Sequence, residues 1–272
     1  MRFGFVTCVQ LGLSCIEAVL EAGGRFELLI TLPDHWAKSK SGRIYLDEVS
    51  ARTGTPLMKV RHINDPAVAE AIRQHRIDWL FIIGWSQIAD QSVLSAPTQG
   101  IIGAHPTLLP TGRGRAAIPW AIIKGLDRTG VTFFRMDEGV DTGDIVGQQE
   151  IQMHDGITAT ELYRMVDEAH VSLIRDIWPS LVDGSCRPRR QDESMATYWE
   201  GRTPADGEIR HDMSVSEVGR LVRATTKPYP GAFLRVDGRE LVIWSGRPGM
   251  HPEGVTLDLL DGSYTAMEYE YR

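Results

Sequence analysis

The chain has 272 residues, a formal net charge of −7, 42% hydrophobic residues and 24% charged residues. This composition is typical of a folded globular protein and excludes a disordered or collagen-like chain. A general nucleic-acid binder would carry a basic surplus, because phosphate neutralisation dominates that affinity, so the acidic balance also argues against that class.

The first part of the chain alternates short apolar runs, typical of strands, with amphipathic stretches, typical of helices. We expect strands over residues 2–9, 26–32, 57–60, 79–85 and 100–105, and helices over residues 13–21, 44–53 and 66–75. Strands that alternate with helices predict a parallel sheet with helices on both faces. The nearly continuous apolar character of these strands fits burial on both faces.

A long amphipathic helix is expected over residues 158–181, with Thr158 or Thr160 as its cap, and the composition becomes more polar after it. We also expect a helix over 119–124, strands over 130–135 and 144–150, a polar linker over 185–212, a helix over 214–225, and strands over 232–236, 240–245, 255–260 and 263–268. The predicted fold is therefore α/β, a Rossmann-like, parallel-rich sheet with helices on both faces, followed by a small β-rich C-terminal subdomain. We expect two domains, 1–190 and 191–272.

The three cysteines, Cys8, Cys15 and Cys186, have neither disulfide-framework nor metal-site spacing. The first residues are typical of a strand, a turn and a helix rather than of a signal peptide. No apolar run reaches the roughly 20 residues that cross a bilayer. We therefore expect a cytoplasmic protein with no membrane association and no metal site.

His105 stands at the end of an apolar strand, directly before Pro106. Ligands of open α/β sheets bind outside the carboxyl ends of the strands. A histidine at such a place can transfer protons near neutral pH. The alternative is a structural histidine that caps a loop by hydrogen bonding.

Two glycine-containing loops follow. In residues 112–115, Gly-Arg-Gly-Arg, the glycines let arginines approach an anion closely, although a plain surface loop would have the same composition. Residues 137–144 hold four carboxylates and two glycines but lack the spacing of an EF-hand calcium loop. This loop is either a solvated turn or one that aims a carboxylate into a site. Asp141 is the candidate, because a carboxylate paired with a histidine orients the imidazole.

Together these segments resemble the folate-dependent formyltransferase family. The resemblance is carried, in this order, by His-Pro-Thr-Leu-Leu-Pro at 105–110, Arg-Gly at 113–114, Gly-Val-Thr at 130–132 and Asp-Thr-Gly at 141–143. It covers about residues 1–185. In the tail, residues 201–206 and 227–233 are similar to two branches, the methionyl-tRNA formyltransferases and the sugar-nucleotide N-formyltransferases.

The resemblance implies transfer of a formyl group from N10-formyltetrahydrofolate to an amine. His105 would stabilise the developing oxyanion or relay a proton, and Asp141 would orient His105 and help to take the proton of the amine. The folate ring would lie against two loops, whose candidate residues are Ile83, Gly84, Trp85, Ser86, Gln87, Met136, Asp137, Gly139 and Val140.

One position departs from the family pattern. Family members with the full triad have Asn two residues before the histidine, whereas this chain has Gly103. A side-chain donor to an oxyanion is worth roughly 3 kcal/mol or more. Three explanations are open: water, Gln87 or Thr107 replaces the amide; the reaction is slower; or the chain hydrolyses the formyl donor or only binds folate.

The amine is expected to belong to a nucleotide-linked amino sugar. The candidate substrate-binding residues are Thr107, Leu109, Arg113, Gly114, Arg115 and Tyr229, and Arg113, Arg115 or Arg223 could help to form a diphosphate site. A small amine or hydroxylamine is a further alternative.

Methionyl-tRNA ranks second among the substrates, for three reasons. The net charge is negative, the tail after Gly231 is short for a complete OB-fold barrel, and the loop 34–43 offers only Lys38, Lys40 and Arg43 as a basic cluster. We also expect that the C-terminal region, with Leu241, Ile243 and Trp244, could pair two subunits into a homodimer.

Overall fold

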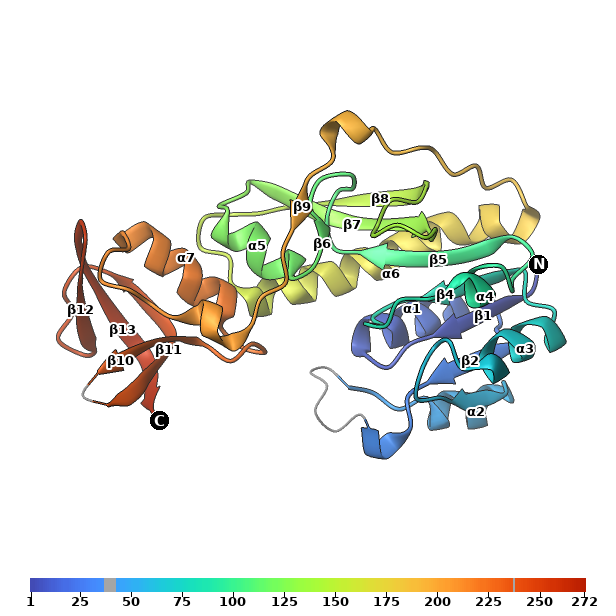
Figure 1. Ribbon diagram of the computed structural model, residues 1–272, viewed down its shortest axis with the longest axis horizontal. Coiled ribbons are helices and arrows are strands. Elements are labelled where there is room, and N and C mark those ends of the chain that lie inside the picture. Colours follow the sequence, from blue (N-terminus) through green and yellow to red (C-terminus); the bar gives the residue numbers. More distant parts are fainter. Residues whose placement is uncertain (37–42, 237) are drawn as a thin grey trace. The chain divides into compact units, whose positions relative to one another are not determined.

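The computed structural model describes residues 1–36, 43–236 and 238–272, so that Lys38 and Lys40 lie outside the described residues (Figure 1). The chain divides into two compact units. The N-terminal unit comprises residues 1–113, 130–150 and 166–197, and the C-terminal unit comprises residues 114–129, 151–165 and 198–272.

A seven-stranded sheet forms the centre of the N-terminal unit, in the order β3-β2-β1-β4-β5-β7-β8 (Figure 1). Its strands are β1 (Phe3–Val6), β2 (Leu28–Thr31), β3 (Leu57–Lys59), β4 (Trp79–Ile82), β5 (Gly100–His105), β7 (Arg128–Arg135) and β8 (Ile145–Gln152). The strands β3, β2, β1, β4 and β5 are parallel to one another, and β7 is antiparallel to β5. The parallel-rich α/β sheet expected from the sequence is therefore confirmed.

Both faces of the strands β1, β2, β4 and β5 are buried, as their continuous apolar character predicts. On one face, Leu80 and Ile82 of β4 share a core with Val68 and Ile72 of α3. On the other face, the rings of Phe3 and Phe81 contact Trp178 of α6, with ring centroids 4.2 and 6.4 Å apart. Burial of one such side chain contributes about 1.5–3 kcal/mol, so these contacts hold the helices on the sheet.

The helices of this part are α1 (Gln10–Glu21), α2 (Asp47–Thr53), α3 (Pro66–Gln74), α4 (Gln91–Leu94) and α6 (Ala159–Asp183), with short 3-10 turns at Asp34–Trp36 and Glu193–Met195. Asp65 caps α3 by accepting a hydrogen bond from the Ala67 amide. The Thr158 hydroxyl accepts one from the Glu161 amide at the start of α6, so Thr158 is the cap of the two that we considered. Among the described residues, no helix is both long and apolar enough to cross a bilayer.

The C-terminal unit contains an antiparallel sheet in the order β10-β11-β13-β12, drawn in orange and red in Figure 1. Its elements are α5 (Ala117–Ile123), a 3-10 turn (Pro204–Gly207), α7 (Val215–Thr225), β10 (Ala232–Val236), β11 (Arg239–Pro248), β12 (Val255–Leu259) and β13 (Gly262–Tyr271). The small strands β6 (Arg113–Gly114) and β9 (Tyr198–Trp199) pair where the chain passes between the units. The expected β-rich C-terminal subdomain is confirmed.

The apolar face of α7 packs on this sheet. Val218 and Val222 of α7 share one core with Leu241 and Ile243 of β11. Ser214 begins the helix with a capping box, in which Ser214 and Glu217 exchange hydrogen bonds. Leu241 and Ile243 are 0% exposed. These two side chains therefore lie in the core of their own chain, which corrects the expectation that they pair subunits.

Candidate functional site

The site begins where the order of the strands reverses in the sheet. The chain adds β2 and β3 on one side of β1 and then returns to place β4 and β5 on the other side. Crevices at such a reversal, outside the carboxyl ends of the strands, are the usual ligand sites of open α/β sheets. Residues 83–87 follow β4, and His105 ends the neighbouring β5. The fold therefore puts two of the predicted site segments at one edge of the sheet.

The ring of His105 is 6% exposed and contacts oxygen atoms at both nitrogens. Its Nε2 lies 2.7 Å from the Gly112 carbonyl oxygen, and its Nδ1 lies 3.4 Å from Oδ2 of Asp141. Because a carbonyl oxygen only accepts, Nε2 carries a proton in this arrangement. A proton that arrives at Nδ1 would be shared with the Asp141 carboxylate. The pair therefore has the geometry to take up and pass on one proton.

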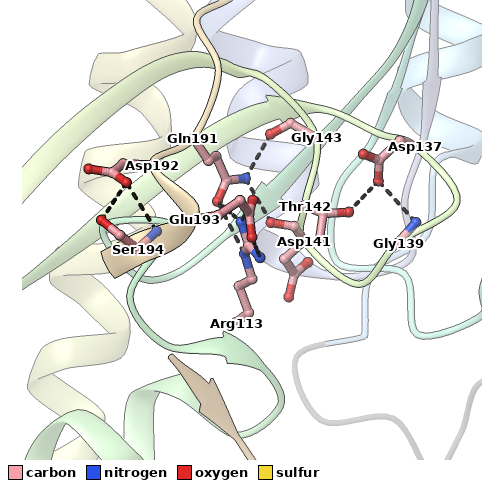
Figure 2. Close-up of polar contacts among 10 residues, drawn as sticks. All are labelled: Arg113, Asp137, Gly139, Asp141, Thr142, Gly143, Gln191, Asp192, Glu193 and Ser194. Atoms are coloured by element: carbon pink, nitrogen blue, oxygen red, sulfur yellow. Dashed lines mark hydrogen bonds and ion pairs between the residues drawn. The ribbon is translucent and has the colours of Figure 1, made fainter. Parts of the chain in front are cut away.

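Asp141 reaches His105 from the tight loop between β7 and β8. Its backbone is left-handed, with φ of 57°, a conformation that aspartate tolerates better than most residues. Next to it, a Cβ at Gly143 would stand 1.6 Å from the Arg135 carbonyl oxygen, so only glycine fits there. Oδ1 of Asp137 accepts hydrogen bonds from the Gly139 amide and the Thr142 hydroxyl (Figure 2). The described residues include no cluster of three His, Cys, Asp or Glu that could hold a metal ion.

The same loop is held from outside by Gln191. The side-chain amide of Gln191 donates to the carbonyl oxygens of Asp141, at 2.8 Å, and Gly143, at 2.7 Å (Figure 2). Its Oε1 accepts from Nη2 of Arg113 at 2.8 Å. Gln191 thus connects the backbone of the carboxylate loop to an arginine.

Arg113 is 0% exposed, and its guanidinium is bound by two side chains. Besides Gln191, it donates to both carboxylate oxygens of Glu193, at 2.6 and 2.9 Å (Figure 2). The hydrogen bond from Arg113 lowers the pKa of Glu193, so this carboxyl stays charged. A guanidinium held in this way serves the loop rather than an open surface.

Sequence reasoning missed Gln191 and Glu193. They lie about 50 and 80 residues from their partners Asp141 and Arg113, in a segment that the composition marks as a polar linker. No local motif carries them. The excess of polar residues in 185–212 was the only signal available in the sequence.

The loop after His105 is fixed by Thr132, which faces His105 across the β5–β7 pair. The Thr132 hydroxyl donates to the Thr107 carbonyl and accepts from the Leu109 amide, and Gln148 donates to the Leu109 carbonyl. Thr107 and Leu109 are 2% and 3% exposed. Both candidate substrate residues are thus packed inside the loop, and the Thr107 hydroxyl has no hydrogen-bond partner among the described residues.

The space beside Gly103 is occupied. A Cβ at this position would stand 3.0 Å from Cγ of Met136 and 3.1 Å from Cζ of Phe134. Gln87, one of the groups considered as a replacement donor, uses its amide to bind the Arg61 carbonyl and its oxygen to accept from the Ile63 amide. The side chain of Gln87 therefore binds the backbone of the loop that contains Arg61 and Ile63.

The first folate-loop candidates, Ile83 to Gln87, form the turn after β4. Ile83 is fully buried, and Gly84 has φ of 69° with no room for a Cβ, which would meet Val9 at 2.1 Å. The Trp85 ring nitrogen donates to Gln87. Trp85, Ser86 and Gln87 line a hollow of about 130 Å³ that also includes Cys8, Leu32 and Trp36.

The second group of folate-loop candidates lies on the β7–β8 loop. Met136 and Asp137 line a hollow of about 380 Å³ together with Gln91 and Leu94. Gly139 and Val140 are exposed at the tip of the loop. The folate candidates that line a hollow therefore fall into two separate hollows of the N-terminal unit, one for each loop.

The remaining substrate candidates, Gly114, Arg115 and Tyr229, belong to the C-terminal unit. Arg115 is exposed, and its backbone amide donates to the Trp199 carbonyl. Tyr229 lines a hollow of about 160 Å³ with Arg202 and Pro119. Burial, followed by the nearby Tyr163, raises the pKa of Tyr229, so its phenol stays neutral and can donate a hydrogen bond.

Comparison with known families agrees with this architecture. The formyl transferase family model matches residues 16–177, and the model of the formyl transferase C-terminal domain matches residues 202–267. The chain therefore belongs to the formyl transferase family. Members of this family use N10-formyltetrahydrofolate as the formyl donor.

Three solved structures illustrate the range of similar proteins. HypX from Aquifex aeolicus, in complex with tetrahydrofolic acid, is 18% identical with a TM-score of 0.69, and the match covers 100% of this chain and 44% of that one. Methionyl-tRNA formyltransferase from Clostridium thermocellum is 18% identical, with a TM-score of 0.64 and 100% and 99% coverage. The N-formyltransferase from Helicobacter canadensis, in complex with folinic acid and dTDP-3-aminofucose, is 15% identical, with a TM-score of 0.76 and 98% coverage of both chains.

At these identities the likeness shows the fold alone. The chain spans less than half the length of the HypX structures that it matches. It spans nearly all of the methionyl-tRNA formyltransferase. The length of the tail therefore does not separate this chain from the tRNA enzymes, which corrects one of the three reasons for ranking tRNA second.

Proposed function

We propose that this chain transfers the formyl group of N10-formyltetrahydrofolate to the amine of a nucleotide-linked amino sugar. The observation that carries the proposal is the His105–Asp141 pair at the carboxyl end of β5, with 3.4 Å between Nδ1 and Oδ2. Such a pair supplies the proton transfer that formylation of an amine requires. We assign this catalytic role to residues 1–190 and treat 191–272 as the second domain.

In the proposed reaction, the neutral amine attacks the formyl carbon. A carbon–nitrogen bond forms to the amine, and the formyl oxygen takes up negative charge. The bond from that carbon to N10 of the folate then breaks, and N10 gains a proton. His105 accepts the proton lost by the amine and shares it with Asp141, while Arg113 acts as a positioning residue through Gln191 rather than as a substrate ligand.

The residues around the pair fit a folate. The hollow of about 380 Å³ beside Met136 and Asp137 is within the size range of small-molecule sites. We propose that one part of the donor binds in this hollow, with Gly139 and Val140 offering backbone groups at the loop tip, and that another part contacts residues 83–87. The buried Ile83 would support this wall rather than contact the ring.

The sugar nucleotide is favoured over methionyl-tRNA by the net charge of −7, which disfavours a large polyanion. The match to the Helicobacter canadensis sugar enzyme supports the same choice. In the C-terminal unit, Tyr229 and Arg115 are the candidates that remain able to contact a substrate.

Gly103 supports a second candidate function. Met136 and Phe134 fill the place where an asparagine would begin, so no side-chain amide serves the oxyanion from position 103. Hydrolysis of the formyl donor, or binding without turnover, is the alternative that this position favours.

The test is an assay of tetrahydrofolate release from 10-formyltetrahydrofolate, followed by absorbance. We expect release only when amino-sugar nucleotides are added, with the formylated product visible by mass spectrometry. Release without any amine would assign the chain as a hydrolase. Release only with charged initiator tRNA, or only with a small hydroxylamine, would overturn the choice of substrate.

A further inference from the structure

A cavity of about 610 Å³ lies entirely within the C-terminal unit. It is formed by α5, the turn after β8, α7 and the sheet. Its volume is within the range of small-molecule sites. None of its lining residues takes part in the His105–Asp141 network, so the cavity can bind a ligand whether or not the proposed function is correct.

Two arginines of α7 face this cavity. Arg220 and Arg223 are three residues apart, which places them on the same side of the helix. Both side chains are half-buried, and the Nε atom of each is buried without a hydrogen-bond partner among the described residues. Among the described residues, the only hydrogen bond of either guanidinium runs from Nη1 of Arg220 to the Ser216 hydroxyl, at 2.8 Å.

The charge on Arg223 is unfavourable in its surroundings. Burial lowers the pKa of Arg223, and the positive charge of Arg220 lowers it further, against the opposing influence of Tyr264 and Asp155. A buried cation without hydrogen bonds is unfavourable unless a partner satisfies it. Arg220 and Arg223 both line the cavity, and the buried Nε atom of each has no acceptor among the described residues.

The other polar groups that line the cavity do not provide an acceptor for the Nε atoms of Arg220 and Arg223. Asp261 uses Oδ1 to accept from the Val215 amide at the start of α7, and His154 lies 3.3 Å from Glu161. Asp155 attracts Arg223 but forms no ion pair with it among the described residues. Burial raises the pKa of Tyr264 to about 12, so its phenol is neutral and can donate a hydrogen bond to an anion.

We propose that this cavity binds a diphosphate-bearing small molecule, with Arg220 and Arg223 as its cation pair. Guanidinium forks match phosphate oxygens, and two of them on one helix face suit an anion with more than one negative charge. Ser216 and Tyr264 add hydroxyl groups. Ile122, Leu126 and Ile157 add an apolar wall against which a nucleoside attached to the diphosphate packs.

The test uses the full chain and inorganic pyrophosphate in isothermal titration calorimetry. Wild-type protein binds the probe saturably, and Arg220→Met and Arg223→Met each weaken binding at least tenfold. Arg210→Met is the matched control, because it removes one positive charge from the same unit at an exposed side chain paired with Asp212. It changes the affinity less than twofold. Absence of saturable binding in the wild type, or unchanged binding in the double variant, would overturn the proposal.

Folding of the variants is checked in the same samples. Removal of an unsatisfied buried charge leaves the melting temperature unchanged or higher, while saturating pyrophosphate raises it in the wild type and not in the double variant. His105→Ala binds pyrophosphate like the wild type, and loss of binding there would place the probe in the catalytic site and contradict the proposal. If the chain shows no transferase activity but binds pyrophosphate in a way that depends on Arg223, the proposed function is wrong and the proposal for this cavity stands. Tighter binding of dTDP than of pyrophosphate identifies a nucleotide as the source of the diphosphate, and equal affinity identifies the diphosphate alone.

Discussion

Arginine side chains have different surroundings in the two units. In the N-terminal unit, Arg113 is fully buried and its guanidinium is bound by Gln191 and Glu193. In the C-terminal unit, Arg220 and Arg223 keep buried Nε atoms without partners beside a cavity. The same residue type thus fixes a loop in one place and leaves unused donors in the other.

This difference shows how a positioning arginine is told from a binding one. A guanidinium whose donors are satisfied by the protein contributes rigidity, because moving it breaks several charge-assisted hydrogen bonds. A guanidinium whose donors are unsatisfied retains the capacity to bind an anion. Composition alone offered Arg113, Arg115 and Arg223 equally as anion ligands, whereas the structure shows that the Arg113 guanidinium is bound by Gln191 and Glu193.

The largest effect should come from the catalytic pair that the satisfied network holds. His105→Ala should lower the rate of formyl transfer about 10²–10⁴-fold, because general acid–base groups contribute about that much. Asp141→Asn, which keeps the shape but not the charge, should lower it as well. Initial rates of tetrahydrofolate release measure both, and His75→Ala, a histidine of the same unit outside the site, is the control. A rate near that of the wild type in either variant would contradict the assignment.

A second test separates the units by their response to acid. His170 is buried in the N-terminal unit, where burial lowers its pKa to about 4, below its ordinary value near 6.5. As the pH falls, His170 therefore takes up a proton in the unfolded chain before it does so in the folded protein. The neutral, buried His170 therefore makes its full contribution to the free energy of unfolding above about pH 6.5. This contribution, about 3 kcal/mol, is lost as the pH falls toward 4.

Urea unfolding at several pH values between 7 and 4 measures this loss. We expect His170→Leu to remove the corresponding part of the pH dependence and to leave the rest. Since His170 belongs to the N-terminal unit, that unit should unfold first in acid. An unchanged pH dependence in the variant would show that other groups dominate.

A smaller effect is expected when Gln191 is removed. Gln191→Ala deletes two hydrogen bonds to the Asp141 loop and leaves Arg113 with fewer acceptors. We expect a loss of about 1–2 kcal/mol in the free energy of unfolding and a decrease in kcat with little change in KM for the folate. Steady-state kinetics and urea unfolding test this, with the exposed Gln74→Ala as the control. A change confined to stability would mean that the loop holds its position without Gln191.

The smallest effect concerns Gly103. Gly103→Asn should be mildly unfavourable on its own, because the new Cβ stands 3.0 Å from the flexible Met136 side chain. Overpacking of this kind costs about 1–3 kcal/mol, with the lower end expected where the neighbour can move. Combining it with Met136→Ala should recover stability. Thermal unfolding of the single, double and Gly103→Ala variants distinguishes the contribution of the Cβ from that of the amide.

Much of the fold could be predicted from local patterns. Strands such as β5 and β10 begin and end at the predicted residues, because each apolar run is bounded by glycine, proline or charged residues. The helix α4 was missed, since its four residues are too few for a helical period to be visible. The two-residue strands β6 and β9 were missed as well, because they depend on pairing between segments far apart in the chain.

The candidate site was predictable only in part. His105 and Asp141 come together as expected, because strand end and loop carry recognisable residues. The hydrogen-bond partners of Arg113 and Gln87 and the burial of Thr107 were not predictable, since each depends on residues far away in the sequence. Tertiary hydrogen bonds decide whether a polar side chain is available to bind a ligand. The local sequence does not reveal these bonds.

The segments that build the C-terminal unit have a practical consequence for protein engineering. Residues 114–129 and 151–165 belong to that unit, although they lie inside the stretch matched by the N-terminal family model. A chimera that exchanges only the residues after 197 with those of a relative would join a foreign sheet to a native α5. Exchange of the C-terminal unit between family members should therefore transplant three segments together rather than a single C-terminal piece.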